Sequence, residues 1–160
     1  MTIKVGDRLP EATFSVMTED GPAQRTTDDI FKGKKVALFA LPGAFTPTCS
    51  ARHLPGYKEK AQEFRSKGVD TIACLSVNDA FVMGAWGKDQ DVGEDVVMLA
   101  DGNADFTKKV GLEFDGSKFG MGVRSQRYSM LVDDGVVKEL NVEQPGEFKV
   151  SSAEHMLGQL

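Results

Sequence analysis

The residues best suited to chemistry lie between positions 38 and 53, where the chain reads LFALPGAFTPTCSARH. The apolar run of residues 36–41 predicts a buried strand that ends at a Pro-Gly pair. A helix is then expected, because Thr46 is a suitable N-cap and Pro47 falls at the first helical position, where its missing N–H is tolerated. Cys49 follows three residues after the cap, so the sequence predicts a cysteine in the first turn of a helix.

This placement favours reactivity at Cys49, because unpaired backbone N–H groups and the positive end of the helix dipole stabilise a thiolate. The Thr46 hydroxyl and nearby backbone N–H groups could polarise an oxygen-containing substrate and receive charge on its leaving group. Each residue also has a simpler interpretation. Cys49 could be a small buried hydrophobe, Thr46 only a cap, and Pro42 only the end of a strand.

His53 stands four residues after Cys49 and can share its helix face, so a Cys–His pair for acyl transfer is an alternative. The sequence shows no oxyanion site and no group that would orient such a histidine. His53 is also suited to structural hydrogen bonding near a kink. Cys74 and His155 lack the spacing of metal ligands, so we predict no metal site.

The composition fits a small globular protein. The chain has 160 residues, 41% of them hydrophobic, which predicts one domain over residues 1–160. A net charge of −5 and the lack of a Lys/Arg block argue against nucleic-acid or membrane binding. No apolar stretch approaches the roughly 18 residues of a membrane span, and the first residues resemble no targeting signal. With only two cysteines, we expect a reduced, cytoplasmic protein.

The elements around Cys49 predict a strand–helix–strand unit. Its helix should kink at Pro55, continue to residue 67 and stop at Gly68. Residues 69–77 are β-branched and apolar, which predicts a second strand parallel to the first. Next we expect a helix over residues 78–86, with Asn78 as its N-cap.

The remaining segments are shorter. The pattern predicts strands at residues 12–17 and 96–100, a helix at 104–110, and a hairpin of strands 128–132 and 136–142. Residues 111–126 form a glycine-rich loop that is expected to be mobile or to wrap an edge of the site. Ser151 and Glu154 could form the capping box of a last helix. This order of elements predicts an α/β fold with a mixed sheet.

The text PGAFTPTC, residues 42–49, resembles the active-site signature of the peroxiredoxins, Pro-x-x-x-Thr-x-x-Cys. The longer PGAFTPTCSARHLPGY resembles their type II branch, and the likeness extends over nearly the whole chain. The resemblance implies a thioredoxin-like fold: a central mixed sheet flanked by helices on both faces, with a peroxiredoxin-type insertion at residues 78–100. It also implies reduction of hydrogen peroxide and alkyl hydroperoxides through a Cys49 sulfenic acid.

The same resemblance implies a set of catalytic residues, namely Pro42, Thr46, Cys49 and Arg127. By itself Arg127 would be interpreted as a surface arginine. However, Arg127-Tyr128-Ser129 matches the type II text better than the segment at Arg124 does. The guanidinium would then stabilise the thiolate and the negative charge on the peroxide oxygen, while Pro42 would shield the sulfur from water.

The reductant is the open question of such a cycle. Cys74 lies within an apolar strand and is expected to be inert, and no cysteine follows it. Type II members without a later cysteine typically use glutathione, often with glutaredoxin, so the resemblance implies a one-cysteine cycle with glutathione as co-substrate and no bound cofactor. Thioredoxin as reductant and a non-enzymatic redox sensor are the alternatives.

The resemblance also implies a homodimer. It would place three large apolar residues near a subunit contact beside the site, although each could equally belong to the core. They are Phe45, Phe81 and Trp86.

Overall fold

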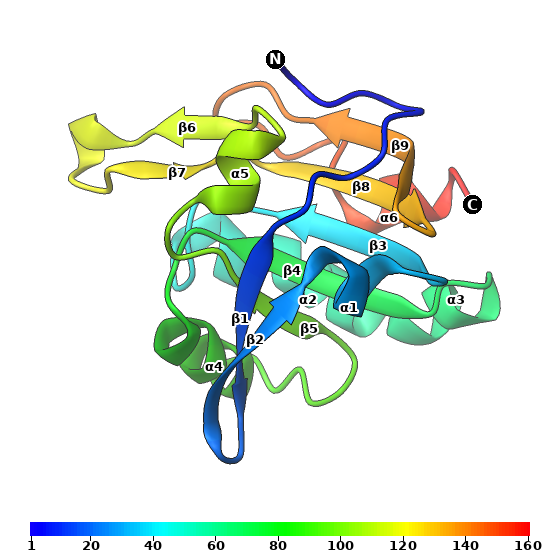
Figure 1. The fold of residues 1–160 in the computed structure, drawn as a ribbon, viewed down its shortest axis with the longest axis horizontal. Helices are drawn as coiled ribbons and strands as arrows, with labels where there is room; N and C mark the ends of the chain where they lie inside the picture. The colour runs from blue at the N-terminus through cyan, green and yellow to red at the C-terminus, as the bar shows by residue number, and fades with distance from the viewer.

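A seven-stranded mixed β-sheet runs through the computed structural model, which describes residues 1–160 (Figure 1). Its strand order is β2-β1-β5-β4-β3-β8-β9. In chain order these strands are β1 (Thr13–Thr18), β2 (Gly21–Thr26), β3 (Lys35–Ala40), β4 (Thr71–Ser76), β5 (Val97–Ala100), β8 (Tyr128–Asp133) and β9 (Val136–Val142). The three central strands β5, β4 and β3 are parallel, and the outer pairs run antiparallel to their neighbours.

Helices cover both faces of this sheet. They are α1 (Thr27–Phe31), a π-helix at Cys49–His53, α2 (Leu54–Glu59), α3 (Ala61–Ser66), α4 (Ala80–Asp89), α5 (Asp105–Lys109) and α6 (Ala153–Leu157). Alternate residues of β3 point to opposite faces. Ala37 and Phe39 pack with α2, α3, α4 and α6, whereas Val36, Leu38 and Ala40 pack with α1 and α5. The prediction of a mixed sheet with helices on both faces is confirmed.

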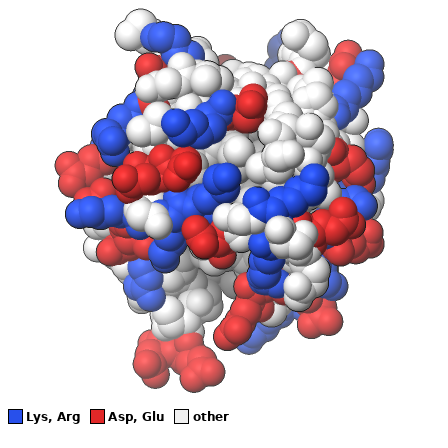
Figure 2. Space-filling view, turned by 90° about the vertical axis from the view of Figure 1, so that its right-hand side faces the viewer, with Lys and Arg blue, Asp and Glu red and all other residues white.

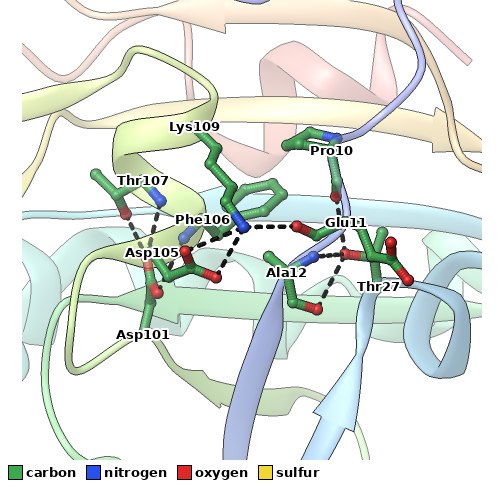
Figure 3. A network of polar contacts seen from close by, with 9 residues as sticks. All are labelled: Pro10, Glu11, Ala12, Thr27, Asp101, Asp105, Phe106, Thr107 and Lys109. Atoms are coloured by element: carbon green, nitrogen blue, oxygen red, sulfur yellow. Dashed lines mark hydrogen bonds and ion pairs between the residues drawn. The ribbon is translucent and has the colours of Figure 1, made fainter.

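The N-terminal segment and α5 are tied to the sheet by a polar network (Figure 3). The Thr27 hydroxyl accepts a hydrogen bond from the Ala12 amide at 2.9 Å, and Lys109 Nζ donates to the Glu11 carbonyl at 2.9 Å. The buried Asp101 carboxylate accepts from two backbone amides of α5. These contacts hold short elements whose own helical propensity is too limited to fix them.

The helix after Cys49 differs from the prediction. Instead of one kinked helix there is a π-helical turn at Cys49–His53, then α2, a break at Lys60 and α3. The Leu54 amide donates to the Cys49 carbonyl, five residues back. In a regular helix the Pro55 ring would clash with the carbonyl four residues earlier, and the wider π-turn relieves that clash. The distortion therefore falls on the turn that carries Cys49.

Two predicted caps are wrong by one residue. Asp79, not Asn78, caps α4, and Ser152, not Ser151, caps α6. Asn78 instead accepts a hydrogen bond from the Ala44 amide at 3.0 Å. Asn78 and Ser151, the two residues predicted as caps, instead bond to Ala44 and Glu143. The local sequence does not indicate these contacts.

The glycine-rich segment 111–126 is also more regular than predicted. It contains a two-stranded ribbon of β6 (Glu113–Asp115) and β7 (Val123–Ser125), joined through a 3₁₀ turn at Ser117–Phe119. The ribbon projects from the body of the protein at the upper left of Figure 1. By contrast, the β8–β9 hairpin agrees with the prediction, and Asp134 and Gly135 both have positive φ, as a tight two-residue turn requires.

Charged groups of both signs are interspersed on the face shown in Figure 2. None of the helices combines the length and the apolar character needed to cross a bilayer. No three His, Cys, Asp or Glu side chains gather in a group that could hold a metal ion.

Candidate active site

Cys49 opens the π-helix that follows the end of β3, and its side chain is fully buried. Helical hydrogen bonding begins where the sequence predicts, because the Ser50 amide donates to the Thr46 carbonyl at 2.9 Å. The Thr46 hydroxyl, however, donates to the Gly43 carbonyl at 2.7 Å. It therefore braces the turn before the helix, and its oxygen lone pairs remain available to accept a hydrogen bond.

The turn before the helix is held in an unusual conformation. Phe45 has a φ of 63°, a left-handed conformation that is uncommon for a bulky residue. A methyl group on Gly43 would lie 3.0 Å from Arg124 Nη1, so the arginine passes close over the backbone at this point. Arg124 also donates from Nε to the Met121 carbonyl at 3.0 Å. These contacts bring the base of the β6–β7 ribbon against the turn.

Arg127 reaches the sulfur because of strand order. Strand β8 lies beside β3, with Tyr128 opposite Ala40. The residue just before β8 therefore stands where β3 gives way to the Cys49 turn. From there Arg127 Nη2 donates to Cys49 Sγ at 3.1 Å. Of the two candidate arginines, the structure brings Arg127 to the sulfur and Arg124 to the turn backbone.

His53 supports the arginine rather than the sulfur. Its Nδ1 lies 2.9 Å from Arg127 Nη1, and its Nε2 lies 3.1 Å from the Ser151 carbonyl oxygen. Burial and the Arg127 charge lower the pKa of His53 to about 3, although the bond to Ser151 opposes them. The imidazole is therefore neutral, with both nitrogens engaged. The structure contradicts a Cys–His pair for acyl transfer and agrees with the structural interpretation of His53.

Cys74 lies on β4, opposite Phe39 of β3, and is fully buried. Burial raises the pKa of its thiol, and the charge of Cys49 adds to this effect while Arg127 opposes it. A thiol that resists ionisation is a poor nucleophile. The location in a buried strand matches the sequence-based expectation.

Aromatic groups enclose the site. The Phe148 ring meets the His53 ring edge-on at 5.1 Å, and the Arg127 guanidinium lies 5.9 Å from its centre. The exposed Arg52 lies over the same ring at 4.7 Å. Trp86 Nε1 donates to Ser50 Oγ at 3.0 Å. Cys49 itself belongs to a buried apolar cluster that includes Trp86, and Arg127 is the cation bonded to its sulfur.

Two contributors to the site were not predicted from the sequence. Phe148 and Ser151 come from a segment far from Cys49 in the chain, and no local pattern marks them as part of the site. Pro42, expected to shield the sulfur, is half-buried. Its carbonyl lies 3.5 Å from Arg124 Nη1.

A family model, characterised relatives and solved structures all resemble this chain over nearly its whole length. The Redoxin family matches residues 4–157. Peroxiredoxin-2E, chloroplastic, of Arabidopsis thaliana is 54% identical over 98% of this chain and 68% of its own length, and Peroxiredoxin-2B of Arabidopsis thaliana is 51% identical over 97% and 96%. Among solved structures, reduced Prx3 of Vibrio vulnificus in complex with H2O2 superposes with a TM-score of 0.95, at 54% identity and 99% coverage of both chains.

Proposed function

Because this chain belongs to the Redoxin family and is a type II peroxiredoxin with the thioredoxin-like fold, a thiol peroxidase, we propose that Cys49 is its peroxide-reducing thiol. The observation that carries this assignment is the 3.1 Å contact between Arg127 Nη2 and Cys49 Sγ within a buried site. The only other cysteine, Cys74, lies within the sheet and has no arginine bonded to its sulfur.

In the proposed first step, the Cys49 thiolate attacks one oxygen of a hydroperoxide and the O–O bond breaks. The sulfur becomes a sulfenic acid, and the other oxygen leaves as an alkoxide or hydroxide that takes up a proton. Arg127 can stabilise both the thiolate and the charge that develops on the leaving oxygen. The Thr46 oxygen can accept a hydrogen bond from the peroxide O–H, and Pro42 limits water access.

Glutathione is the proposed reductant, in a one-cysteine cycle. A first glutathione thiol condenses with the sulfenic acid to give a mixed disulfide and water, and a second thiol, free or on glutaredoxin, releases Cys49 and forms the oxidised product. The burial of Cys74 supports a reducing thiol that comes from another molecule.

A cytoplasmic location is also proposed. The two cysteines are both free, which supports a reducing compartment.

A side-by-side peroxide assay tests the reductant. We expect sustained hydrogen peroxide consumption with glutathione and glutaredoxin, and slower consumption with thioredoxin and its reductase. The same protein with no reductant should consume one equivalent and stop. Sustained turnover only with thioredoxin would overturn the glutathione assignment, and no sustained turnover with any thiol would favour a redox sensor.

Arg52 is suited to attract glutathione, which carries two carboxylates. Arg52 is exposed, lies over Phe148 and makes no ion pair in the structure. We compare the rate with glutathione to the rate with neutral 2-mercaptoethanol. Arg52→Ala should lower the ratio of these two rates about three-fold, because an exposed charge pair contributes about 0.2–1 kcal/mol. Arg65→Ala, which removes a surface pair with Asp95, is the matched control. An unchanged ratio in Arg52→Ala would exclude the contact.

A homodimer is also proposed. Phe45 and Phe81 are 53% and 66% exposed, as a subunit contact requires, whereas Trp86 is fully buried and belongs to the core. We expect a mass in solution of twice 17.4 kDa, and we expect Phe81→Glu to shift the protein toward monomer because it places a charge in an apolar contact. Val5→Glu, at a 55% exposed apolar position, is the control. Light scattering that shows a native monomer at micromolar concentration would refute the dimer.

A further inference from the structure

Glu143 is a buried carboxylate that the peroxidase chemistry does not account for. It directly follows β9 and is 7% exposed. Its Oε2 accepts three hydrogen bonds, from the Lys149 amide at 2.7 Å, the Ser151 amide at 2.8 Å and the Ser151 hydroxyl at 2.6 Å. No cation pairs with it in the structure. Burial opposes its ionisation, but the hydrogen bonds from Ser151 and Lys149 outweigh burial and lower its pKa.

These bonds hold the Ser151 amide and hydroxyl, while the Ser151 carbonyl oxygen accepts hydrogen bonds from other residues. That oxygen accepts from the Tyr57 hydroxyl at 2.8 Å and lies 3.1 Å from His53 Nε2. A carbonyl oxygen can only accept, so Nε2 must carry the imidazole proton. Because the imidazole is neutral, Nδ1 must then be the unprotonated nitrogen.

The tautomer of His53 determines what Arg127 can do. Unprotonated Nδ1 accepts a hydrogen bond from Arg127 Nη1 at 2.9 Å, which leaves Nη2 directed at Cys49 Sγ at 3.1 Å. The opposite tautomer would present an N–H to the guanidinium, and two donors cannot pair. Glu143 also reaches Arg127 through the backbone, since its amide donates to the Arg127 carbonyl at 2.9 Å.

We propose that Glu143 is a positioning residue for peroxide reduction, which orients the Arg127 guanidinium toward Cys49 through Ser151 and His53. The inference rests on the proposed roles of Cys49 and Arg127. Without the carboxylate, three donors of the 149–151 segment lose their acceptor. The Ser151 carbonyl is then no longer held at His53 Nε2, and the guanidinium loses the acceptor that aims it.

The test compares Glu143→Ala with Glu143→Gln. The alanine variant should lower the second-order rate with hydrogen peroxide about ten-fold and raise the pH midpoint of Cys49 alkylation by iodoacetamide, because an unaimed guanidinium stabilises the thiolate less. Glu143→Gln keeps an oxygen acceptor for the same donors and should restore most of the rate. Glu147→Ala, which removes an exposed partner of Lys149 on the same segment, is the matched control and should resemble the native protein.

A double-mutant cycle separates a specific effect on the orientation of Arg127 from a general destabilisation of the structure. If Glu143 acts through Arg127, Glu143→Ala should have little further effect on rate or alkylation midpoint in an Arg127→Gln background. An equal fold-loss in both backgrounds, or a native rate in Glu143→Ala, would overturn the proposal. If Glu143→Ala does not fold, Ser151→Ala takes its place, because it removes one donor to the carboxylate and should show the same background dependence. A native protein that reacts no faster than free cysteine would instead refute the proposed function.

Discussion

Cys49→Ser is expected to reduce peroxide consumption to the level of buffer, while Cys74→Ser should keep most of the native rate. A serine hydroxyl does not ionise near neutral pH, so contact with Arg127 cannot turn it into a nucleophile that breaks an O–O bond. Cys74 lies within a strand, where burial raises the pKa of its thiol. The measurement is steady-state consumption of hydrogen peroxide with saturating glutathione and glutaredoxin.

The Cys74→Ser variant also serves as the control for a cysteine substitution as such. Both thiols are fully buried, so thermal unfolding of each variant should be compared before activities are. A loss of turnover in Cys74→Ser with native stability would contradict the one-cysteine cycle, because it would mean that the second sulfur takes part. Residual turnover in Cys49→Ser would contradict the assignment of the reactive thiol.

Arg127→Gln is expected to lower the rate of reaction with hydrogen peroxide about a hundred-fold. The change removes the group that donates to Cys49 Sγ, and loss of one preorganised donor to developing negative charge typically lowers rates by about 10²–10³. The rate of Arg127→Lys should fall between those of the native protein and Arg127→Gln. A lysine ammonium keeps the positive charge, but it cannot reproduce the planar guanidinium that donates to both the sulfur and His53. Stopped-flow measurement of the single-turnover rate isolates this step from reduction by thiols.

Arg65→Ala is the matched control for loss of a guanidinium, since Arg65 pairs with Asp95 at the surface. Its single-turnover rate should equal that of the native protein. A native rate in Arg127→Gln would show that the 3.1 Å contact with the sulfur is incidental to the reaction.

The parts of the fold that the sequence predicted are those with a local signal. The apolar runs before Pro42 and around Cys74 mark strands β3 and β4, and the Asp134–Gly135 turn marks the β8–β9 hairpin. In each case a single short segment carries both the hydrophobic pattern and the residue that ends it. Tertiary context did not need to be known.

The errors arise where a distant partner decides the outcome. Asn78 was a plausible cap, but its side chain binds the Ala44 amide across the site, and Asp79 takes the cap instead. Strands β6 and β7 are only three residues long and glycine-rich around their turn, so no alternation was visible.

The candidate site divides in the same way. Cys49 and Thr46 could be recognised from spacing at a helix start, whereas Arg127 stood out only through resemblance to a family. The structure adds the reason for its position, which is the pairing of β8 with β3. His53, Ser151 and Glu143 form a chain of contacts in which His53 and Ser151 are 98 residues apart. A single sequence does not visibly encode that proximity.

The hydrogen bond between Trp86 Nε1 and Ser50 Oγ gives the protein an intrinsic optical probe. Trp86 is the only tryptophan, so its emission reports a single environment. Its hydrogen-bond partner, Ser50, is the residue next to Cys49, the proposed peroxide-reducing thiol. If oxidation of Cys49, or a mixed disulfide with a thiol reductant, rearranges the π-turn, the indole should lose its partner and change its fluorescence. Each proposed half-reaction could then be followed in unlabelled protein, without a coupled enzyme or an added dye.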